Sequence, residues 1–391
     1  MIKKLFFALI ITVLCLNANA QWTNKTFVFG SATRSYRVYV SPSYNVANPA
    51  SLVITLHGLG DNMTNFSMLG FDDIADTANI IVVCPQAVDD PMVSAYLGAG
   101  SGTAWNSGAG MYITGFGWYY PNSSVNDIGF INALVDTARA NYSIDPSRMY
   151  LCGFSMGGFM TERMALQSNL SFAAFASMSG TIGAGITTLN PGRVVPIAHF
   201  HGTADSTVYF TGNQFGLDAD SIINFWVANN LCNPVPDSTG FVDAVADGIT
   251  VDKFSYTGSG IDNEVLFYRM NGAGHTVLFE PNNDITEIME VWMFFLRHKN
   301  LTAQVPEQNI ESGIQVFPNP ATDFVNVVLP KTSEKLQVEL FTIQGARVYS
   351  ELIRDSFHHI SLSNANFGNG IYLLRVSGGT VNFTQQILIQ K

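Results

Sequence analysis

The sequence has little of several features that mark common classes of protein. It contains four cysteines and no C-x-x-C pair, so we do not expect a structural zinc site. Only 13% of its residues are charged, the formal net charge is −11, and no run rich in lysine or arginine occurs. Nucleic acid and anionic membrane surfaces need a basic face, so neither is expected as a partner.

Only one long hydrophobic run approaches the length of a membrane segment, and it lies at the N-terminus. Lys3 and Lys4 precede an apolar run from Leu5 to Leu16, and Ala18-Asn19-Ala20 follows it. This order is typical of a cleaved secretion signal, and the run is too short for a stable anchor in a bilayer. We therefore expect residues 1–20 to be a signal peptide, and the protein to be exported without stable membrane insertion.

The remaining cysteines do not suggest a disulfide framework. Removal of residues 1–20 leaves Cys84, Cys152 and Cys232, and three cysteines cannot all pair with one another. Cys84 and Cys152 each lie at the end of an apolar run, so we predict that they are small buried hydrophobic residues.

The body of the chain alternates between apolar runs and helical patterns. The 391 residues, of which 47% are hydrophobic, are too many for one ordinary domain. Residues 26–29 and 35–40 predict antiparallel strands, and buried strands are predicted at 51–56, 80–85, 148–152, 172–179, 196–201 and 266–270. Residues 21–300 therefore predict an α/β domain with a mostly parallel sheet, in which ligands bind at the carboxyl ends of the strands.

The pattern changes after Asn300. Residues 301–313 are polar and lack a clear period, which predicts a linker. Residues 314–391 contain short alternating strands and no helical pattern, which predicts a small all-β sandwich. His358 and His359 are expected to lie between two of these strands on a solvated surface.

The most informative segment is the G-x-S-x-G sequence from Gly153 to Gly157, with Ser155 at its centre. An apolar strand pattern precedes it and a helical pattern follows, which is the context of a nucleophile elbow. Such a turn strains the backbone of the serine, so nearby residues must be small, as Gly153, Gly157 and Gly158 are. We therefore predict that Ser155 is a catalytic nucleophile.

A nucleophilic serine needs a base to accept its proton and a carboxylate to orient that base. In α/β-hydrolases the order along the chain is serine, acid, histidine. Asp205 follows the strand that ends near His201, and His275 follows the strand at 266–270 among small residues. We predict Asp205 as the acid and His275 as the base, with no need for a metal or an organic cofactor.

The other histidines of this domain are expected to have structural roles. We expect His199 and His201 to point to opposite faces of their strand, which argues against a shared metal, and His201 to bond the following turn. His298 is expected to be exposed. His57 precedes Ser155 and so does not fit the order expected of the base, and we expect it to shape its loop through hydrogen bonds.

Two further groups of residues are candidates for contacts with a substrate. The oxyanion of an ester hydrolase needs two N–H donors, for which we predict Met156 and Leu59, with Gly58 as the alternative to Leu59. Trp105, Asn106, Trp118 and Tyr119 lie in a segment rich in glycine and aromatics. Such a segment either lines a binding cleft or packs as a loop with buried aromatics, and both interpretations stay open. Asp127 is expected to cap the helix that follows it.

Several motifs occur in a fixed order along residues 25–300. They are His57-Gly58, Trp105-Asn106, Asp127 to Ile131, Ile144 to Tyr150, the elbow, His201 to Asp205 and Gly274 to Thr276. Together they resemble a family of exported esterases with the α/β-hydrolase fold. The family includes poly(3-hydroxybutyrate) depolymerase-like enzymes and the feruloyl and acetylxylan esterases of carbohydrate esterase family 1.

The resemblance implies a secreted serine esterase that forms an acyl-enzyme and acts on a polymeric ester or its oligomers, with Ser155, Asp205 and His275 as its triad. Two positions differ from the family. Val277-Leu278 stands where many members have tryptophan and Pro-Gly, and Met156 stands where many have asparagine. Three alternatives remain: a feruloyl or acetylxylan esterase, a peptidase of the same fold, and a non-catalytic protein that binds a glycan or polymer.

The C-terminal segment resembles the sorting domain of the type IX secretion system of Bacteroidetes. The matching residues are Val316 to Asp323, Gly345 and Gly370-Ile371-Tyr372. The resemblance implies export through the periplasm to the cell surface or medium, with the type IX machinery as a partner. The alternative is an accessory sandwich that binds carbohydrate or polymer.

Overall fold

The computed structural model describes residues 22–98, 100, 102–168, 172–260, 262–300, 314–319, 321–329, 335–342, 346–354, 356–363, 367–378 and 381–390. The chain divides into two compact units after Asn300. The expected signal peptide at 1–20, the expected linker at 301–313 and Gly345 lie outside the described residues.

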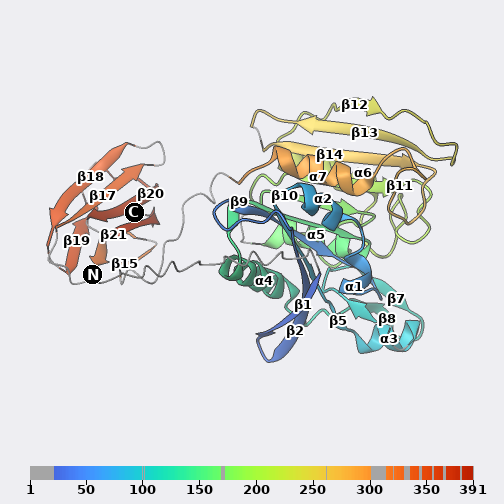
Figure 1. Ribbon diagram of the computed structural model, residues 1–391, viewed down its shortest axis with the longest axis horizontal. Helices are drawn as coiled ribbons and strands as arrows, with labels where there is room; N and C mark the ends of the chain where they lie inside the picture. Colours follow the sequence, from blue (N-terminus) through green and yellow to red (C-terminus); the bar gives the residue numbers. More distant parts are fainter. Residues whose placement is uncertain are drawn as a thin grey trace, which may run out of the picture. The chain divides into compact units, whose positions relative to one another are not determined.

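The first unit is built on a ten-stranded sheet in the order β1-β2-β4-β3-β9-β10-β11-β14-β13-β12 (Figure 1). Its six central strands run parallel: β4 (Ile80–Pro85), β3 (Ala50–Leu56), β9 (Ile144–Phe154), β10 (Ala174–Met178), β11 (Ile197–Gly202) and β14 (Glu264–Asn271). Antiparallel strands complete the edges: β1 (Thr23–Phe29), β2 (Ala32–Val40), β12 (Asp237–Gly240) and β13 (Thr250–Thr257). The prediction of a mostly parallel α/β sheet is confirmed, but β12 and β13 were missed because these strands lack a continuous apolar run.

Helices cover both faces of this sheet. They are α1 (Met63–Phe66), α2 (Phe71–Thr77), α3 (Pro91–Leu97), α4 (Asp127–Asn141), α5 (Met156–Gln167), α6 (Ala219–Asn229) and α7 (Glu287–Arg297). Leu52 and Ile54 of β3 pack in the core that includes residues of α4, α5 and α6, whereas Val53 packs in the core that includes residues of α2 and α7. Side chains alternate along a strand, so a strand covered on both faces is mostly apolar, and all seven residues of β3 are buried.

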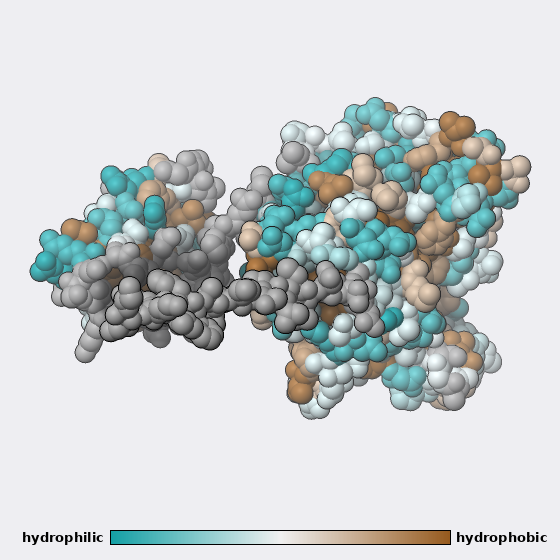
Figure 2. All heavy atoms as spheres, viewed as in Figure 1, coloured by the Kyte–Doolittle hydropathy of each residue, from teal (hydrophilic) through white to brown (hydrophobic). Residues whose placement is uncertain are grey.

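The first unit also contains two small antiparallel sheets of two strands each. Strands β5 (Val88–Asp89) and β6 (Thr103–Ala104) pair on either side of α3, and β7 (Met111–Ile113) and β8 (Gly117–Tyr119) form a hairpin. On the face shown in Figure 2, hydrophilic residues cover much of the first unit and hydrophobic residues form small separate groups. Across the described parts of the chain, no helix is long and apolar enough to cross a membrane.

The cysteines follow the expectation from the sequence. Cys84 and Cys152 are buried in the sheet, and neither forms a disulfide. Cys232 is also a free thiol and is partly exposed. Burial raises the pKa of the Cys84 thiol to about 12, so this side chain behaves as a hydrophobic residue at neutral pH.

The second unit consists of antiparallel sheets around a core of its own. One sheet contains β15 (Gln315–Phe317), β16 (Phe324–Val328) and β19 (Phe357–Ser361). The other contains β18 (Arg347–Ile353), β17 (Leu336–Thr342), β20 (Gly370–Gly378) and β21 (Val381–Ile389). Val327, Val338, Leu374 and Ile387 are fully buried between them, and the predicted all-β architecture is confirmed.

The expectation that His358 and His359 lie between strands is wrong. Both residues lie within β19. The His358 Nε2 atom lies 2.7 Å from the hydroxyl of Tyr349, and the His359 Nδ1 atom lies 2.9 Å from Asn326 Oδ1. The sequence did not indicate this strand because only Ile360 in it is buried.

Candidate active site

The elbow places Ser155 between a strand and a helix. Strand β9 ends at Phe154 and helix α5 begins at Met156, while Ser155 itself has φ 55° and ψ −122°. This positive φ is unfavourable for a residue with a side chain, so packing around the turn must hold it. A Cβ atom on Gly157 would lie 2.0 Å from the Leu56 carbonyl oxygen. The expected need for small residues beside Ser155 is therefore confirmed.

The structure brings Ser155, His275 and Asp205 together. The His275 Nε2 atom lies 2.8 Å from Ser155 Oγ, and the His275 Nδ1 atom lies 2.7 Å from Asp205 Oδ2. The other carboxylate oxygen accepts the backbone N–H groups of Thr207 and Val208 at 2.8 and 2.9 Å. Because the carboxylate accepts a hydrogen from Nδ1, Nε2 has the lone pair that can accept the serine proton.

The loops that hold Asp205 and His275 are fastened to each other. They follow β11 and β14, which are parallel neighbours and so end at the same edge of the sheet. The Ala204 N–H donates to the Ala273 carbonyl at 2.9 Å, and the Gly272 N–H donates to the Thr203 hydroxyl at 2.9 Å. The distance between the acid and the base is therefore set by backbone contacts as well as by the side chains.

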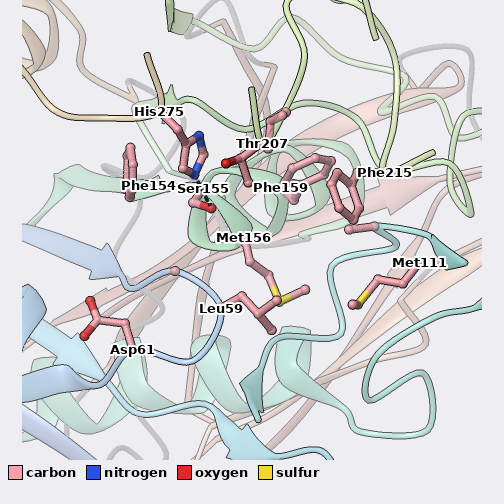
Figure 3. Close-up of a pocket in the computed structure, with 13 residues that line it drawn as sticks. Leu59, Asp61, Met111, Phe154, Ser155, Met156, Phe159, Thr207, Phe215 and His275 are labelled. Atoms are coloured by element: carbon pink, nitrogen blue, oxygen red, sulfur yellow. Dashed lines mark hydrogen bonds between the residues drawn. The ribbon is translucent and has the colours of Figure 1, made fainter. Parts of the chain in front are cut away.

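A pocket of about 310 Å³ opens beside Ser155. Figure 3 shows His275 and Phe154 on one side of the serine, with Met156, Phe159 and Phe215 extending away from it. Most of the lining is apolar, and it comes from Gly58, Leu59, Asp61, Ala109, Met111, Phe154, Ser155, Met156, Phe159, Thr207, Val208, Phe215 and His275. No lysine or arginine lines it, so the pocket suits an uncharged apolar group.

The loop after β3 passes close to the serine. A Cβ atom on Gly58 would lie 3.3 Å from the Cβ of Ser155, and Leu59 lines the pocket together with Met156. Buried His57 supports this loop: its Nδ1–H donates to the Gly58 carbonyl at 2.8 Å, and its Nε2 accepts the Ala87 N–H at 3.0 Å. Burial lowers the pKa of His57, which favours this neutral form. The expected role of His57 in shaping the loop is confirmed, and the oxyanion-donor roles of Leu59 and Met156 stay predictions.

Two of the predicted substrate residues are structural. Trp105 is completely buried, and its indole N–H donates to the His57 carbonyl at 2.8 Å. The Asn106 amide nitrogen donates to the Val125 carbonyl at 2.7 Å, and its backbone N–H donates to Asp127 at 2.8 Å. Neither residue lines the pocket beside Ser155, and the burial of Trp105 fits the alternative interpretation of this segment, a packed loop with buried aromatics. Their polar atoms instead hold the loops in place.

Tyr119 and Trp118 do not line the pocket either. The Tyr119 hydroxyl donates to buried Asp90 at 2.7 Å. Burial, assisted by this carboxylate, raises the pKa of Tyr119 to about 12. The polar end of Tyr119 is therefore engaged within the protein, and its contact with a substrate stays a prediction. Trp118 is 58% exposed on β8 and remains available to a large substrate.

Asp127 is the first residue of α4, and the cap is Asn126, whose side chain accepts the Gly129 N–H at 2.9 Å. The predicted capping role of Asp127 is therefore wrong. Its carboxylate is buried and forms an ion pair with buried Arg34 at 2.9 Å. A buried charge needs such a partner, and no sequence pattern indicates that these two distant residues meet.

Two expectations about histidines are also wrong. His298 is buried, and its Nε2 atom lies 2.7 Å from a carboxylate oxygen of Glu264. His199 and His201 lie on the same face of β11, with His199 Nε2 3.2 Å from His201 Nδ1. Side chains two residues apart share a face of a strand because the period is two. The expected bond from His201 to the turn is confirmed, since its Nε2–H donates to the Val208 carbonyl at 2.8 Å.

Several residues that line the pocket are not among those predicted from the sequence. Phe159 lies four residues after Ser155, so the helical period could have placed it on the same face of α5. Met111 begins β7 and Phe215 lies in the segment between β11 and α6, and no motif includes either of them. Within the described part of the chain, no group of histidine, cysteine or acidic residues is arranged to hold a metal ion.

Two parts of the chain match different known protein families. Residues 43–216 match the family described as phospholipase/carboxylesterase. Residues 315–390 match the family described as secretion system C-terminal sorting domain. The two matches fall on opposite sides of the division between the structural units at residue 300.

Curated relatives of the first unit are esterases and a depolymerase. A bifunctional acetylxylan esterase/xylanase of Neocallimastix patriciarum is 32% identical over 46% of this chain and 22% of its own length. Poly(3-hydroxyalkanoate) depolymerase C of Paucimonas lemoignei is 27% identical over 46% of this chain and 39% of its own length. A probable feruloyl esterase C of Aspergillus niger is 25% identical over 51% of this chain and 63% of its own length. The chain thus spans less than two thirds of each of these relatives.

Among solved structures, an acetyl xylan esterase from Aspergillus awamori superposes with a TM-score of 0.47 at 14% identity, covering 70% of this chain and 99% of that one. The sheet order, the elbow and the family matches agree on the architecture. The first unit therefore has the α/β-hydrolase fold and matches a carboxylesterase family over residues 43–216, the C-terminal unit matches a secretion-system sorting domain over residues 315–390, and this second match indicates a secreted protein.

Proposed function

We propose that the protein is a secreted serine carboxylic-ester hydrolase that works through an acyl-enzyme. The observation that carries the proposal is the continuous hydrogen-bonded series from Ser155 through His275 to Asp205 at the edge of an apolar pocket. Ser155 Oγ attacks the ester carbonyl while His275 Nε2 accepts its proton, and Asp205 orients the imidazole and stabilises its charged form. Protonated His275 then donates its proton to the leaving alcohol. In the second half of the reaction, His275 accepts a proton from water, which attacks the acyl-enzyme and releases the acid and free Ser155.

The negative oxygen of the tetrahedral intermediate needs donors that are in place before the reaction. We assign this role to the backbone N–H groups of Leu59 and Met156. Their positions support the assignment, because both residues line the pocket beside Ser155 and come from the two segments that supply these donors in α/β-hydrolases.

The pocket supports an acyl group larger than acetyl. Its volume of about 310 Å³ is at the lower end of the range of about 300 to 1,000 Å³ for small-molecule sites. Met111, Phe159 and Phe215 give it an apolar wall that a hydroxybutyryl or an aromatic acyl group would contact. We therefore place hydroxyalkanoate oligomers first and feruloyl esters second among the substrates, and acetylated xylan third.

An exposed aromatic hairpin supports a polymeric substrate. Tyr112 and Trp118 face each other across β7 and β8 with ring centroids 6.1 Å apart, and Phe116 at the turn is 72% exposed. Met111, next to Tyr112, lines the pocket. We propose that this hairpin contacts a stretch of polymer beyond the ester that is cleaved, since exposed aromatic rings bind apolar and ring-shaped groups.

Export is part of the proposal. Residues 1–20 would direct the chain to the periplasm, and residues 314–391 would then be recognised by the type IX secretion machinery. The sorting-domain match at residues 315–390 supports this route. Deletion of residues 314–391 should leave the esterase in the periplasm, and appearance of the truncated protein in the medium would contradict the assignment.

The direct test of the activity is labelling with a fluorophosphonate probe, which reacts with activated serines. The wild-type protein should be labelled and should hydrolyse p-nitrophenyl butyrate, while Ser155→Ala should do neither. A panel of hydroxybutyrate oligomer, methyl ferulate and acetylated xylan should rank in that order by kcat/KM. Full activity in Ser155→Ala would remove the mechanism, and a preference for acetylated xylan would reverse the substrate assignment.

A further inference from the structure

A series of buried polar side chains extends from helix α5 to the turn that carries Asp205. Glu162 lies on α5, and His199 and His201 lie on β11. All three side chains are buried, with residue exposures of 0%, 1% and 0%. The reaction proposed above uses none of them, yet His201 Nε2 lies 3.6 Å from the carboxylate oxygen of Asp205 that accepts the His275 N–H.

The hydrogen bonds fix which nitrogen carries the hydrogen in each ring. The Val208 carbonyl can only accept, so the His201 Nε2 atom, 2.8 Å away, must carry a hydrogen. In a neutral ring the His201 Nδ1 atom then has a lone pair, and His199 Nε2 at 3.2 Å must donate to it. The remaining nitrogen of neutral His199, Nδ1, therefore presents a lone pair toward Glu162.

The carboxyl group of Glu162 meets this lone pair. Its Oε2 atom accepts the Trp226 indole N–H at 2.8 Å, and its Oε1 atom lies 3.8 Å from His199 Nδ1. In the described part of the chain, neither Oε1 nor Nδ1 has a partner within hydrogen-bond distance, and the hydroxyl of Ser177 is a further polar group that acts on this carboxyl. An ionised carboxylate facing a lone pair would leave two buried acceptors with no hydrogen between them, which is unfavourable.

The Val208 end of the series is part of the acid's own turn. The Val208 N–H donates to Asp205 Oδ1 at 2.9 Å, while the Val208 carbonyl accepts from His201. If His201 carried its hydrogen on Nδ1 instead, its Nε2 lone pair would face the Val208 carbonyl and the Asp205 carboxylate. Both contacts would become repulsive, and the turn that holds Asp205 against His275 would shift.

We propose that Glu162 and His199 hold one proton between them, with Glu162 as the neutral acid, and that Glu162 is thereby a positioning residue for the triad. The O–H of Glu162 faces the lone pair of His199 Nδ1 across 3.8 Å, His199 donates to His201, and His201 donates to Val208. This one-way series keeps the Asp205–Val208 turn in the geometry that orients His275. The inference rests on the proposed esterase function, because it assigns how that triad is held.

The surroundings support this protonation pattern. Burial raises the pKa of Glu162 to about 8, and burial lowers the pKa of His199 to about 3 and that of His201 to about 4. Trp226 on α6, Ser177 on β10 and His199 on β11 are the polar groups that interact with Glu162, and none of them is a cation at neutral pH. The charged and titratable groups that act on His201 are His199, Asp205 and His275. Loss of the shared proton above about pH 8 therefore places an uncompensated charge in the series and leaves two buried acceptors facing each other at its start.

The test compares Glu162→Gln with Glu162→Met, with kcat and KM for p-nitrophenyl butyrate measured between about pH 6 and pH 10. The glutamine amide can donate to His199 and accept from Trp226 but cannot ionise, so kcat at neutral pH should stay within about twofold of wild type. Methionine can do neither, so kcat should fall between about 10- and 100-fold with KM little changed. Wild type should lose kcat as Glu162 ionises near pH 8, and Glu162→Gln should keep its kcat to higher pH.

Glu287→Gln is the matched control, because Glu287 is also fully buried with a pKa raised by burial to about 8, yet it lies on α7 outside this series. The Glu287→Gln protein should show the same loss of kcat at alkaline pH as the wild-type protein. A Glu162→Gln protein as impaired as Glu162→Met would overturn the inference, because an ionised carboxylate would then be needed. An unchanged alkaline fall in Glu162→Gln would overturn it too, and this comparison decides the matter even if Glu162→Met does not fold. If the wild-type protein is active and Ser155→Ala is inactive, the esterase assignment stands even when the Glu162 variants contradict this inference.

Discussion

Asp205 has a histidine on each side of it, and the two surroundings differ. His275 lies 2.7 Å away with 17% of its side chain exposed, beside the pocket and Ser155. His201 lies 3.6 Å away with its side chain fully buried, and it leads inward to His199. Contact with Ser155 places the first imidazole where it can take part in proton transfer, whereas burial lowers the pKa of the second one and keeps it neutral. The same residue type next to the same carboxylate is thus suited to proton transfer on one side and to support on the other.

The largest effect on activity should come from the side of Asp205 on which His275 contacts Ser155. Replacing Ser155 by alanine removes the nucleophile, so kcat should fall by roughly 10⁶-fold while the free energy of unfolding changes little. Kinetics with p-nitrophenyl butyrate and urea denaturation measure the two quantities. Ser147→Ala, at a buried serine of β9, provides a control for the loss of a serine hydroxyl elsewhere. Equal losses of activity in both variants would refute the special role of Ser155.

The carboxylate between the two histidines should come next. Asp205→Asn keeps the shape of the side chain, but its amide no longer provides a negative acceptor for the His275 N–H, so the imidazole loses its orientation and stabilisation. We expect kcat to fall by about 10⁴-fold. The exposed surface carboxylate Asp220, on α6, provides Asp220→Asn as a control. A loss of less than about tenfold in Asp205→Asn would indicate that another residue is the acid.

A substitution on the buried side of Asp205 should mainly lower the free energy of unfolding. His201→Phe fills the same space but removes the donor to Val208 and the acceptor for His199, so buried partners lose their hydrogen bonds. We expect the free energy of unfolding to fall by about 1 to 3 kcal/mol, measured by urea denaturation at neutral pH. A variant as stable as wild type would show that the buried hydrogen bonds do not stabilise the fold.

Buried His199 and buried Glu162 should also make the free energy of unfolding depend on pH, in opposite directions. The folded-state pKa of His199 is lowered from 6.5 to about 3, so the unfolded chain binds protons more readily and stability should fall as the pH drops below about 6.5. The folded-state pKa of Glu162 is raised from 4.5 to about 8, so its contribution to stability is complete below about pH 4.5 and is lost as the pH rises toward 8. Urea denaturation across this range should show a shallower alkaline decline in Glu162→Gln than in wild type, and identical slopes would contradict the assignment.

The smallest effect should come from outside the pocket. Trp118→Ala removes an exposed ring from the β7–β8 hairpin and leaves the triad untouched. We expect hydrolysis of a polymeric substrate to fall about three- to tenfold, in line with the loss of about 1 kcal/mol from one aromatic contact, and hydrolysis of p-nitrophenyl butyrate to stay the same. A parallel loss on both substrates would place the effect in the fold or the triad instead.

The local parts of the site could be predicted from the sequence because each depends on a short pattern. The elbow needs a strand, three small residues and a helix in a row, and Ser155 lies where these patterns meet. Asp205 and His275 each follow a predicted strand, so the rule that parallel strands end at one edge brought them near Ser155. Edge strands such as β12 gave no such signal, because a fully exposed strand needs no apolar run.

The sequence by itself therefore determined the class of fold, the small C-terminal β unit and which serine, acid and histidine to consider together. Tertiary structure decided the surroundings of each side chain. It buried Trp105, paired Arg34 with Asp127, placed His298 inside the fold and left Trp118 exposed. Backbone patterns repeat over a few neighbouring residues, whereas burial and hydrogen-bond partners come from segments far apart in the chain. For this reason the two histidines beside Asp205 have different properties that only the folded protein assigns.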